Sequence, residues 1–251
     1  MQLDPAAAAA GVRHVHRDTI DSTNVEALRL ARAGERGPIW ITAGRQSAGR
    51  GRRGRTWVSE PGNLYASLLL VDAGPAEHAP ELSFVAALAA HDAIAGRIPG
   101  LASRLKLKWP NDLLIDRNKC AGILVEGEGQ GERYAVAIGI GVNCAHHPDG
   151  TEYPATDLAA AGVRATPERL FEALSAAMLA RLAQWDRGGD FAAIRADWLA
   201  HAAKLGDEIR VAVETGERVG RFESVDARGH LVLRYADGSA ETIAAGDVAG
   251  R

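Results

Sequence analysis

The sequence predicts an α+β protein: a mixed or antiparallel sheet covered by helices on one side, followed by a small C-terminal β-barrel. Two observations indicate this class. Before residue 204, strand-like and helix-like segments follow one another without the strict βαβ rhythm of a parallel sheet. From Gly206 onward, short alternating segments are separated by turn signals. We therefore predict two domains, at residues 1–203 and 204–251.

Four helices are expected in the first domain, each begun by a capping signal or marked by apolar residues at helical spacing. They run from the cap Asp21-Ser22-Thr23-Asn24 to a stop at Gly34, over residues 82–98, from Thr166 to Trp185, and over residues 191–202. The alanine-rich residues 1–10 are expected to form a frayed terminus rather than a secretion signal.

Strands are expected where short apolar runs are bounded by turn residues. In the first domain these runs are residues 38–43, 64–71, 105–109, 113–115, 121–126 and 135–142. In the second domain the runs at 209–213, 218–225, 231–235 and 241–243 predict a small barrel of about five short strands.

The composition is that of an ordinary globular protein, with 47% hydrophobic and 24% charged residues. No apolar run approaches the roughly 20 residues that span a bilayer, so no membrane partner is expected. Two cysteines, Cys120 and Cys144, are too few for a disulfide framework and indicate a reducing cytoplasm. The net charge of −3 argues against a surface built for nucleic acid, so DNA is not an expected partner.

Residues 46–55, here called the arginine loop, read Gln-Ser-Ala-Gly-Arg-Gly-Arg-Arg-Gly-Arg and contain no acid. Glycines let a backbone approach a ligand closely, and guanidinium groups match phosphate and carboxylate oxygens. The loop is therefore suited to folding over an anionic ligand. Because its like charges repel one another, disorder is expected in its resting state.

Three other interpretations of the arginine loop remain open. Gly49, Gly51 and Gly54 satisfy the spacing of a dinucleotide-binding loop, with Asp72 about 20 residues further on. That motif has to open a helix, and residues 56–62 are a poor helix. A nucleic-acid patch lacks neighbouring basic elements and aromatic residues. A plain surface connection would leave four arginines unpaired.

A second polar segment, Lys108-Trp109-Pro110-Asn111-Asp112, lies between two strand-like runs. Pro-Asn-Asp is a good turn in its own right, so a structural role and a site are both open. Lys119 leads into the next strand, where an unpaired ammonium group is rarely tolerated. An anionic partner would explain this lysine. Cys144, His146 and His147 match no common zinc spacing, so no protein-bound metal is expected.

Five motifs in this order resemble the signatures of the biotin protein ligase family. They are Asp21-Ser22-Thr23-Asn24, the arginine loop, Lys108-Trp109-Pro110-Asn111-Asp112, Lys119-Cys120-Ala121-Gly122-Ile123-Leu124 and Gly139-Ile140-Gly141-Val142-Asn143. The resemblance is dense over residues 18–145, and the small C-terminal barrel is similar to the family's second domain. It implies a class II synthetase-like catalytic domain followed by an SH3-like barrel.

The resemblance also implies roles for individual residues. The implied biotin-binding residues are Ser22, Thr23, Asn24, Gln46, Arg50, Gly51, Arg52 and Lys119. The implied nucleotide-binding residues are Arg50, Arg52, Trp57, Asn111 and Asn143, with Trp57 stacking on adenine. Lys119, Arg52 and Asp112 are implied to act in the reaction itself. Ser47 and Cys120 replace the threonine and leucine that are common in the family, which are small departures.

The family resemblance implies an ATP-dependent reaction in two halves. Biotin is first activated to biotinyl-5'-AMP, with Mg²⁺ accompanying ATP, and is then transferred to a lysine of a biotin carboxyl carrier protein. That carrier would be a subunit of acetyl-CoA carboxylase or of a related carboxylase. Few residues precede the first motif, so the enzyme-only class without a helix-turn-helix domain is expected. A homodimer is left open.

Three rival functions are weighed against this one. An enzyme that transfers lipoate or octanoate shares the general fold, but the arginine loop and the Lys-Trp-Pro-Asn-Asp segment favour biotin. A nucleic-acid-binding module is disfavoured by the negative net charge. A biotin-binding protein without catalysis is disfavoured by the presence of Lys119 and Asp112.

Overall fold

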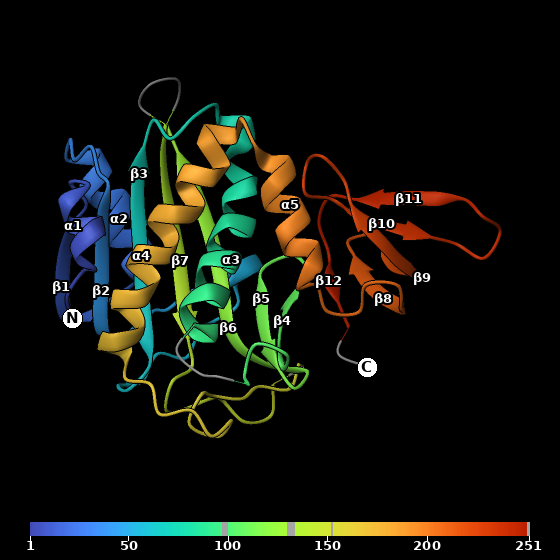
Figure 1. Ribbon diagram of the computed structural model, residues 1–251, viewed down its shortest axis with the longest axis horizontal. Helices are drawn as coiled ribbons and strands as arrows, with labels where there is room; N and C mark the ends of the chain where they lie inside the picture. The colour runs from blue at the N-terminus through green and yellow to red at the C-terminus, as the bar shows by residue number, and fades with distance from the viewer. Residues whose placement is uncertain (97–99, 130–133, 152, 250–251) are drawn as a thin grey trace.

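A seven-stranded sheet forms the centre of the protein in the computed structural model, which describes residues 1–96, 100–129, 134–151 and 153–249 (Figure 1). Its order is β1-β2-β3-β7-β6-β5-β4. The strands are β1 (Arg13–Ile20), β2 (Ile39–Gln46), β3 (Leu64–Val71), β4 (Leu105–Lys108), β5 (Asp112–Ile115), β6 (Asn118–Glu128) and β7 (Ala135–Val142). β1 pairs with β2 in parallel, and the other neighbours are antiparallel. The predicted mixed sheet is confirmed.

Helices cover both faces of this sheet. Figure 1 shows α3 (Leu82–Ala95), α4 (Pro167–Trp185) and α5 (Phe191–Ala200) in front of it, where they share the main apolar core. α2 (Thr23–Arg32) packs on β2, β3 and β7 from the opposite side, over a smaller apolar cluster. Side chains alternate along a strand, so Trp40 faces the main core while Ile41 faces α2. The prediction that helices cover only one side of the sheet is therefore wrong. The cavity described in the next section lies at the N-terminus of α2, on the second side.

Two N-terminal elements were not predicted. Residues expected to fray contain α1 (Pro5–Ala9), whose first turn is capped by the Asp4 carboxylate and whose Ala7 is fully buried. The backbone N–H of Asp4 also donates to Ser175 Oγ of α4 at 2.9 Å, which ties the terminus to the domain. β1 escaped prediction because its sequence, Arg-His-Val-His-Arg-Asp-Thr-Ile, is a largely exposed edge without apolar alternation.

The predicted small β domain follows α5 as a second, antiparallel sheet of order β11-β10-β9-β8-β12. Its strands are β8 (Glu208–Val213), β9 (Gly216–Val225), β10 (Leu231–Arg234), β11 (Ala240–Ile243) and β12 (Asp247–Val248). Within the described residues no ladder joins β11 to β12, so this sheet is open rather than a closed barrel. It stands beside α5 at one end of the molecule (Figure 1).

Most predicted segments lie within a few residues of the observed elements. β3 and β7 have the predicted bounds, and the helix predicted at 82–98 ends at Ala95. Residues 97 and 98 of that prediction lie outside the described residues. None of the described helices has the length and apolar character needed to cross a membrane.

Candidate active site

One cavity of about 690 Å³ is lined by every residue to which the sequence assigned a binding or reactive role. These residues are Ser22, Thr23, Asn24, Gln46, Arg50, Gly51, Arg52, Trp57, Asn111, Asp112, Lys119 and Asn143. They come from the start of α2, the end of β2, the arginine loop, and the strands β5, β6 and β7. The small domain supplies part of one wall through Ala212, Glu217, Asp247, Val248 and Ala249.

One end of the cavity is a buried network of neutral hydrogen-bonding groups. The backbone N–H and the hydroxyl of Thr23 lie 2.8 and 3.1 Å from Gln46 Oε1, and Gln46 Nε2 donates to Ser59 Oγ at 2.9 Å. Ser67 Oγ lies 2.7 Å from Thr23 Oγ1 and 2.6 Å from Asn24 Oδ1. These bonds fix the first turn of α2 against β2 and β3, so its polar groups are held in place before a ligand arrives.

Ser22 has an unusual position at the start of α2. A serine at the N-cap commonly accepts a hydrogen bond from a backbone N–H of the first turn. Among the described residues, the Ser22 hydroxyl accepts no hydrogen bond from a backbone N–H of α2. The residue is only 3% exposed, and it lines the cavity. Its hydrogen-bonding capacity is thus directed to the cavity rather than to the helix.

Glycines of the two central strands form the floor on which Trp57 rests. A Cβ atom at Gly141 would lie 2.6 Å from the Trp57 ring, and one at Gly122 would lie 3.0 Å from it. Larger residues at either position would displace the indole. Trp57 Nε1 is buried and has no acceptor among the described residues. A buried N–H donor without an acceptor is costly, so this atom is available to a ligand oxygen.

The opposite end of the cavity is cationic, because two lysines surround one carboxylate. Asp112 Oδ1 lies 2.6 Å from Lys119 Nζ, and Asp112 Oδ2 accepts from Lys108 Nζ at 3.1 Å. Burial by itself would raise the pKa of Asp112, but the two ammonium groups outweigh it and hold that pKa below its usual value. The cluster therefore keeps a net charge of +1, and Lys119 is the more exposed of its two cations.

Two asparagines connect this end to the rest of the wall. Asn111 Nδ2 donates to the carbonyl of Ile123 on β6, and its Oδ1 lies 3.4 Å from Arg52 Nη1. Asn143 Nδ2 donates to the Thr156 carbonyl at 3.0 Å. Both side chains are therefore anchored in the fold while they line the cavity.

The arginine loop is folded rather than extended. The N–H of Gly51 donates to the carbonyl of Arg55 at 2.7 Å, and that of Trp57 donates to the carbonyl of Gly49 at 2.9 Å. A Cβ atom at Gly49 would lie 2.4 Å from the Trp57 carbonyl oxygen. Gly49 is thus required by the close approach of the two sides of the loop.

The arginines of the loop are paired, contrary to the expectation of a disordered loop without counter-charges. Arg50 Nη2 lies 2.9 Å from Glu126 Oε2. Arg52, Arg53 and Arg55 reach the carboxylate of Asp247 at 3.5, 3.4 and 3.1 Å. The neutralising acids come from β6 and from the small domain, so they are invisible in the loop sequence.

Ser67, Glu126 and Asp247 contact residues of the site and were missed by sequence reasoning. Ser67 is the one hydroxyl besides a tyrosine in the otherwise apolar β3, which was an available signal. Glu126 accepts from both Asn24 Nδ2 and Arg50, and Asp247 binds three arginines. Neither acid has a local sequence pattern that marks it.

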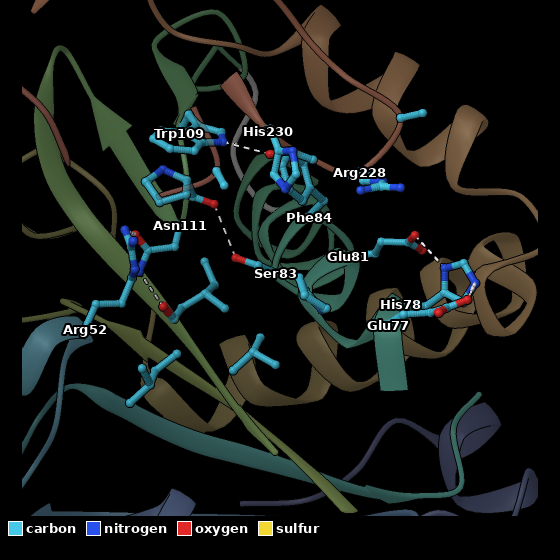
Figure 2. A pocket seen from close by; sticks show the side chains of 18 residues that line it. Arg52, Glu77, His78, Glu81, Ser83, Phe84, Trp109, Asn111, Arg228 and His230 are labelled. Atoms are coloured by element: carbon cyan, nitrogen blue, oxygen red, sulfur yellow. Dashed lines mark hydrogen bonds and ion pairs between the residues drawn. The ribbon is translucent and has the colours of Figure 1, made fainter. Parts of the chain in front are cut away.

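A second cavity, of about 670 Å³, lies at the seam between the domains (Figure 2). The turn after β4 and the start of α3 meet the β9–β10 turn there, and Trp109 Nε1 donates to the Gly229 carbonyl at 3.0 Å. Arg52 and Asn111 line both cavities, so the seam adjoins the side of the site that the arginine loop covers.

One of the histidines near Cys144, His147, has a structural partner. His147 Nδ1 lies 2.6 Å from Asp157 Oδ2, and the Cys144 sulfur is buried. Burial raises the pKa of the Cys144 thiol to about 12, which keeps it protonated at neutral pH.

The mixed sheet carries a cavity that is neutral at one end and cationic at the other, an arrangement typical of enzymes that bind a substrate with an uncharged polar head and an anionic group. The sequence profile of the Biotin/lipoate A/B protein ligase family matches residues 17–143, and that of the Biotin protein ligase C terminal domain matches residues 204–250. The chain belongs to the biotin/lipoate A/B protein ligase family.

Individual relatives agree with this assignment. A biotin–[acetyl-CoA-carboxylase] ligase of Paracoccus denitrificans is 47% identical over 85% of this chain and 91% of its own. A bifunctional ligase/repressor BirA of Bacillus subtilis is 29% identical over 91% of this chain and 71% of its own. Among solved structures, the biotin protein ligase from Aquifex aeolicus in complex with biotin and ATP has a TM-score of 0.77 at 24% identity, covering 94% of this chain and 97% of that one. At this identity the likeness establishes the fold.

Proposed function

We propose that the protein activates biotin with ATP to form biotinyl-5'-AMP and then transfers biotin to a lysine of a biotin carboxyl carrier protein. One observation carries the proposal: a single cavity joins the buried neutral network around Thr23 to the cationic cluster around Lys119. The match of the C-terminal domain to that of biotin protein ligases favours biotin over lipoate or octanoate as the acid.

The neutral end fits the ureido head of biotin, which is uncharged and carries one carbonyl acceptor and two N–H donors. The Ser22 hydroxyl is uncommitted to the helix, and Thr23, Asn24 and Gln46 offer further donors and acceptors. Because this end contains no unpaired charge, it suits a neutral head better than an ionic one. The biotin carboxylate then points toward Lys119.

In the first half-reaction an oxygen of the biotin carboxylate attacks the α-phosphorus of ATP. A new phosphorus–oxygen bond forms, the bond to the oxygen that bridges the α- and β-phosphates breaks, and pyrophosphate leaves. Negative charge has to be neutralised at the reacting carboxylate and phosphate oxygens. We assign this task to Lys119 and Arg52, two of the cations that line the cavity.

In the second half-reaction the carrier lysine, as a neutral amine, attacks the acyl carbon of the mixed anhydride, and AMP leaves. No protein nucleophile is needed. The lowered pKa of Asp112 makes this carboxylate a weak base, so we assign it the role of holding Lys119 in position. Closure of the arginine loop protects the anhydride from water.

Mg²⁺ is proposed to enter as part of the nucleotide substrate. Mg²⁺ prefers carboxylate, phosphate and water oxygens. Three carboxylates line the described cavity, Asp112, Glu217 and Asp247, and each is already in ion pairs with lysine or arginine. The protein therefore offers no dedicated carboxylate cage, which supports delivery of the metal on the phosphates of ATP.

We also propose that the enzyme works in the cytoplasm on a carrier subunit of acetyl-CoA carboxylase or a related carboxylase. The two cysteines are free and buried, as suits a reducing compartment. The Paracoccus denitrificans relative is named for this carboxylase. We further propose that the catalytic domain ends at residue 203 and that the small domain begins at residue 204.

Pyrophosphate release tests the proposed function. The protein is incubated with Mg²⁺ and ATP together with biotin, lipoate or octanoate, and release is followed for each acid. We expect release with biotin alone, followed by labelling of a carrier domain but not of the same domain with its target lysine changed to arginine. Release with lipoate or octanoate alone would overturn the substrate, and silence with all three would overturn the activity.

A further inference from the structure

Ser67 is a fully buried hydroxyl behind the neutral end of the cavity. It lies in the middle of β3, between Ala66 and Leu68, and it is not among the described residues that line the cavity. Its Oγ lies 2.6 Å from Asn24 Oδ1 and 2.7 Å from Thr23 Oγ1. Because Ser67 is 0% exposed, bulk water does not reach it, and these two oxygens are the partners of its hydroxyl in the described structure.

The side-chain amide of Asn24 is held in one orientation. Its Nδ2 lies 3.1 Å from the carbonyl oxygen of Leu124 and 2.8 Å from the carboxylate oxygen Oε2 of Glu126. Carbonyl and carboxylate oxygens accept hydrogen bonds, so the NH2 group faces β6 and Oδ1 faces Ser67. A Cβ atom at Gly139 would lie 2.5 Å from this Oδ1, so the amide lies against β7 where only a glycine leaves room for it.

The orientation of Asn24 fixes the direction of the next two hydrogen bonds. An amide oxygen has no proton, so the Ser67 hydroxyl has to donate to Asn24 Oδ1. A hydroxyl has one proton, so the short contact between the oxygens of Ser67 and Thr23 has to be bridged by the proton of Thr23. If that proton turned to Gln46 Oε1 instead, two oxygens would be left 2.7 Å apart with no proton between them.

Thr23 and Gln46 therefore present two hydrogen-bond acceptors to the cavity, which both residues line. The backbone N–H of Thr23 donates to Gln46 Oε1 at 2.8 Å, which fixes the amide of Gln46 as well. Thr23 Oγ1 lies 3.1 Å from that Oε1, and neither oxygen has a proton to place between them. An N–H donor of a ligand would satisfy this pair of acceptors, whereas a carbonyl or carboxylate oxygen would add a third acceptor to it.

We propose that Ser67 is a specificity-determining positioning residue: it orients the Thr23 hydroxyl so that the neutral end of the cavity selects a head group with an N–H donor, such as a cyclic urea. The identity of the ligand rests on the proposed function, since the ureido ring of biotin carries two N–H groups. Lipoate and octanoate have no N–H at the end opposite the carboxylate, so the same acceptors would stay unpaired with them.

Biotin binding without ATP, measured by isothermal titration calorimetry, tests this role. Ser67→Ala frees the Thr23 proton to turn to Gln46 Oε1, which removes the pair of acceptors, so the Kd for biotin should rise about ten-fold. The matched control is Ser175→Ala. Ser175 is a buried serine of α4 that accepts a hydrogen bond from the backbone of Asp4 and lies outside the described lining of the cavity. The control should bind biotin as wild type does.

A double-mutant cycle separates action through Thr23 from support of the packing around β3. Thr23→Val keeps the shape of the side chain and removes its hydroxyl, so in this background Ser67→Ala should change the Kd for biotin by less than about two-fold. A packing role would weaken binding equally in both backgrounds. Equal losses in the two backgrounds, or a Kd unchanged by Ser67→Ala alone, would overturn the proposal.

The two lactam analogues of biotin, in which one ureido N–H is replaced by a methylene group, report on specificity itself. Wild type should bind one of them about ten-fold more weakly than biotin, and Ser67→Ala should reduce that ratio to within about two-fold. The same ratio in both proteins would contradict the proposed orientation of Thr23. Absence of biotin binding in wild type would overturn the proposed function together with this ligand, whereas normal wild-type binding with an unaffected Ser67→Ala would overturn the role of Ser67 alone.

Discussion

Replacing Asp112 by asparagine should cost about 3 kcal/mol of unfolding free energy, because it strips the charge from a buried carboxylate that serves two lysines. Its oxygens lie 2.6 Å from Lys119 Nζ and 3.1 Å from Lys108 Nζ. Breaking a buried pair costs roughly 3–5 kcal/mol because the partner is left charged and unpaired. The lower end of this range applies, because Lys119 is 27% exposed and water can solvate it when the carboxylate is lost, whereas Lys108 is only 9% exposed.

The assay is urea unfolding at pH 7, with Asp116→Asn as the matched control. Asp116 pairs with Arg104 on the surface, so its loss should cost only about 0–1 kcal/mol. Equal costs for the two variants, or a cost below about 1 kcal/mol for Asp112→Asn, would refute the reasoning that Asp112 neutralises a buried cationic cluster.

The stabilisation that Asp112 provides should depend on pH in a direction set by its lowered pKa. The pKa of Asp112 is lower in the folded than in the unfolded chain, so its stabilisation is present above the unfolded value of about 4. The difference in stability between wild type and Asp112→Asn should be constant from about pH 5 to 8. It should shrink as the pH falls below about 4, because the unfolded carboxylate takes up a proton first, and it is lost once the pH has fallen through the lowered pKa of the folded carboxylate.

Three further predictions concern Lys119, Arg52 and His14. Lys119→Ala should slow biotin-dependent pyrophosphate release by about 10²–10³-fold, and a normal rate would remove this lysine from the chemistry. Arg52→Gly should still form the adenylate but release it faster in rapid filtration; retention as tight as in wild type would contradict loop closure. Burial beside Phe171 lowers the pKa of His14 to about 4, so the unfolded chain takes up a proton first as the pH falls. Stability should therefore decrease between about pH 6.5 and 4, and His14→Gln should flatten that slope in urea unfolding.

Much of the catalytic domain could be predicted because its strands are short apolar runs and its helices have caps. The helix from Pro167 to Trp185 follows directly from a threonine cap and a proline at the first position. β1 could not be predicted, because an exposed parallel edge strand does not need apolar alternation. β12 is only two residues long, too short to leave a periodic pattern.

The composition of the site was predictable, but its electrostatics were not. The family resemblance gave twelve residues that the fold brings to the lining of one cavity. The acids that neutralise the arginine loop lie far away in sequence: Glu126 is 76 residues from Arg50, and Asp247 is 195 residues from Arg52. Only the packing of β6 and of the small domain against the loop places them there. A cationic loop therefore cannot be taken as unpaired from its own sequence.

The reaction intermediate offers the most direct test of the central claim that one cavity binds biotin and ATP together and joins them. The protein is incubated with biotin, ATP and Mg²⁺ in the absence of any carrier, passed rapidly through a desalting column, and denatured. The released small molecules are then identified by mass spectrometry. We expect biotinyl-5'-AMP at close to one molecule per chain, with none formed by Lys119→Ala in the same time. Recovery of biotin alone, while ATP remains intact, would contradict it.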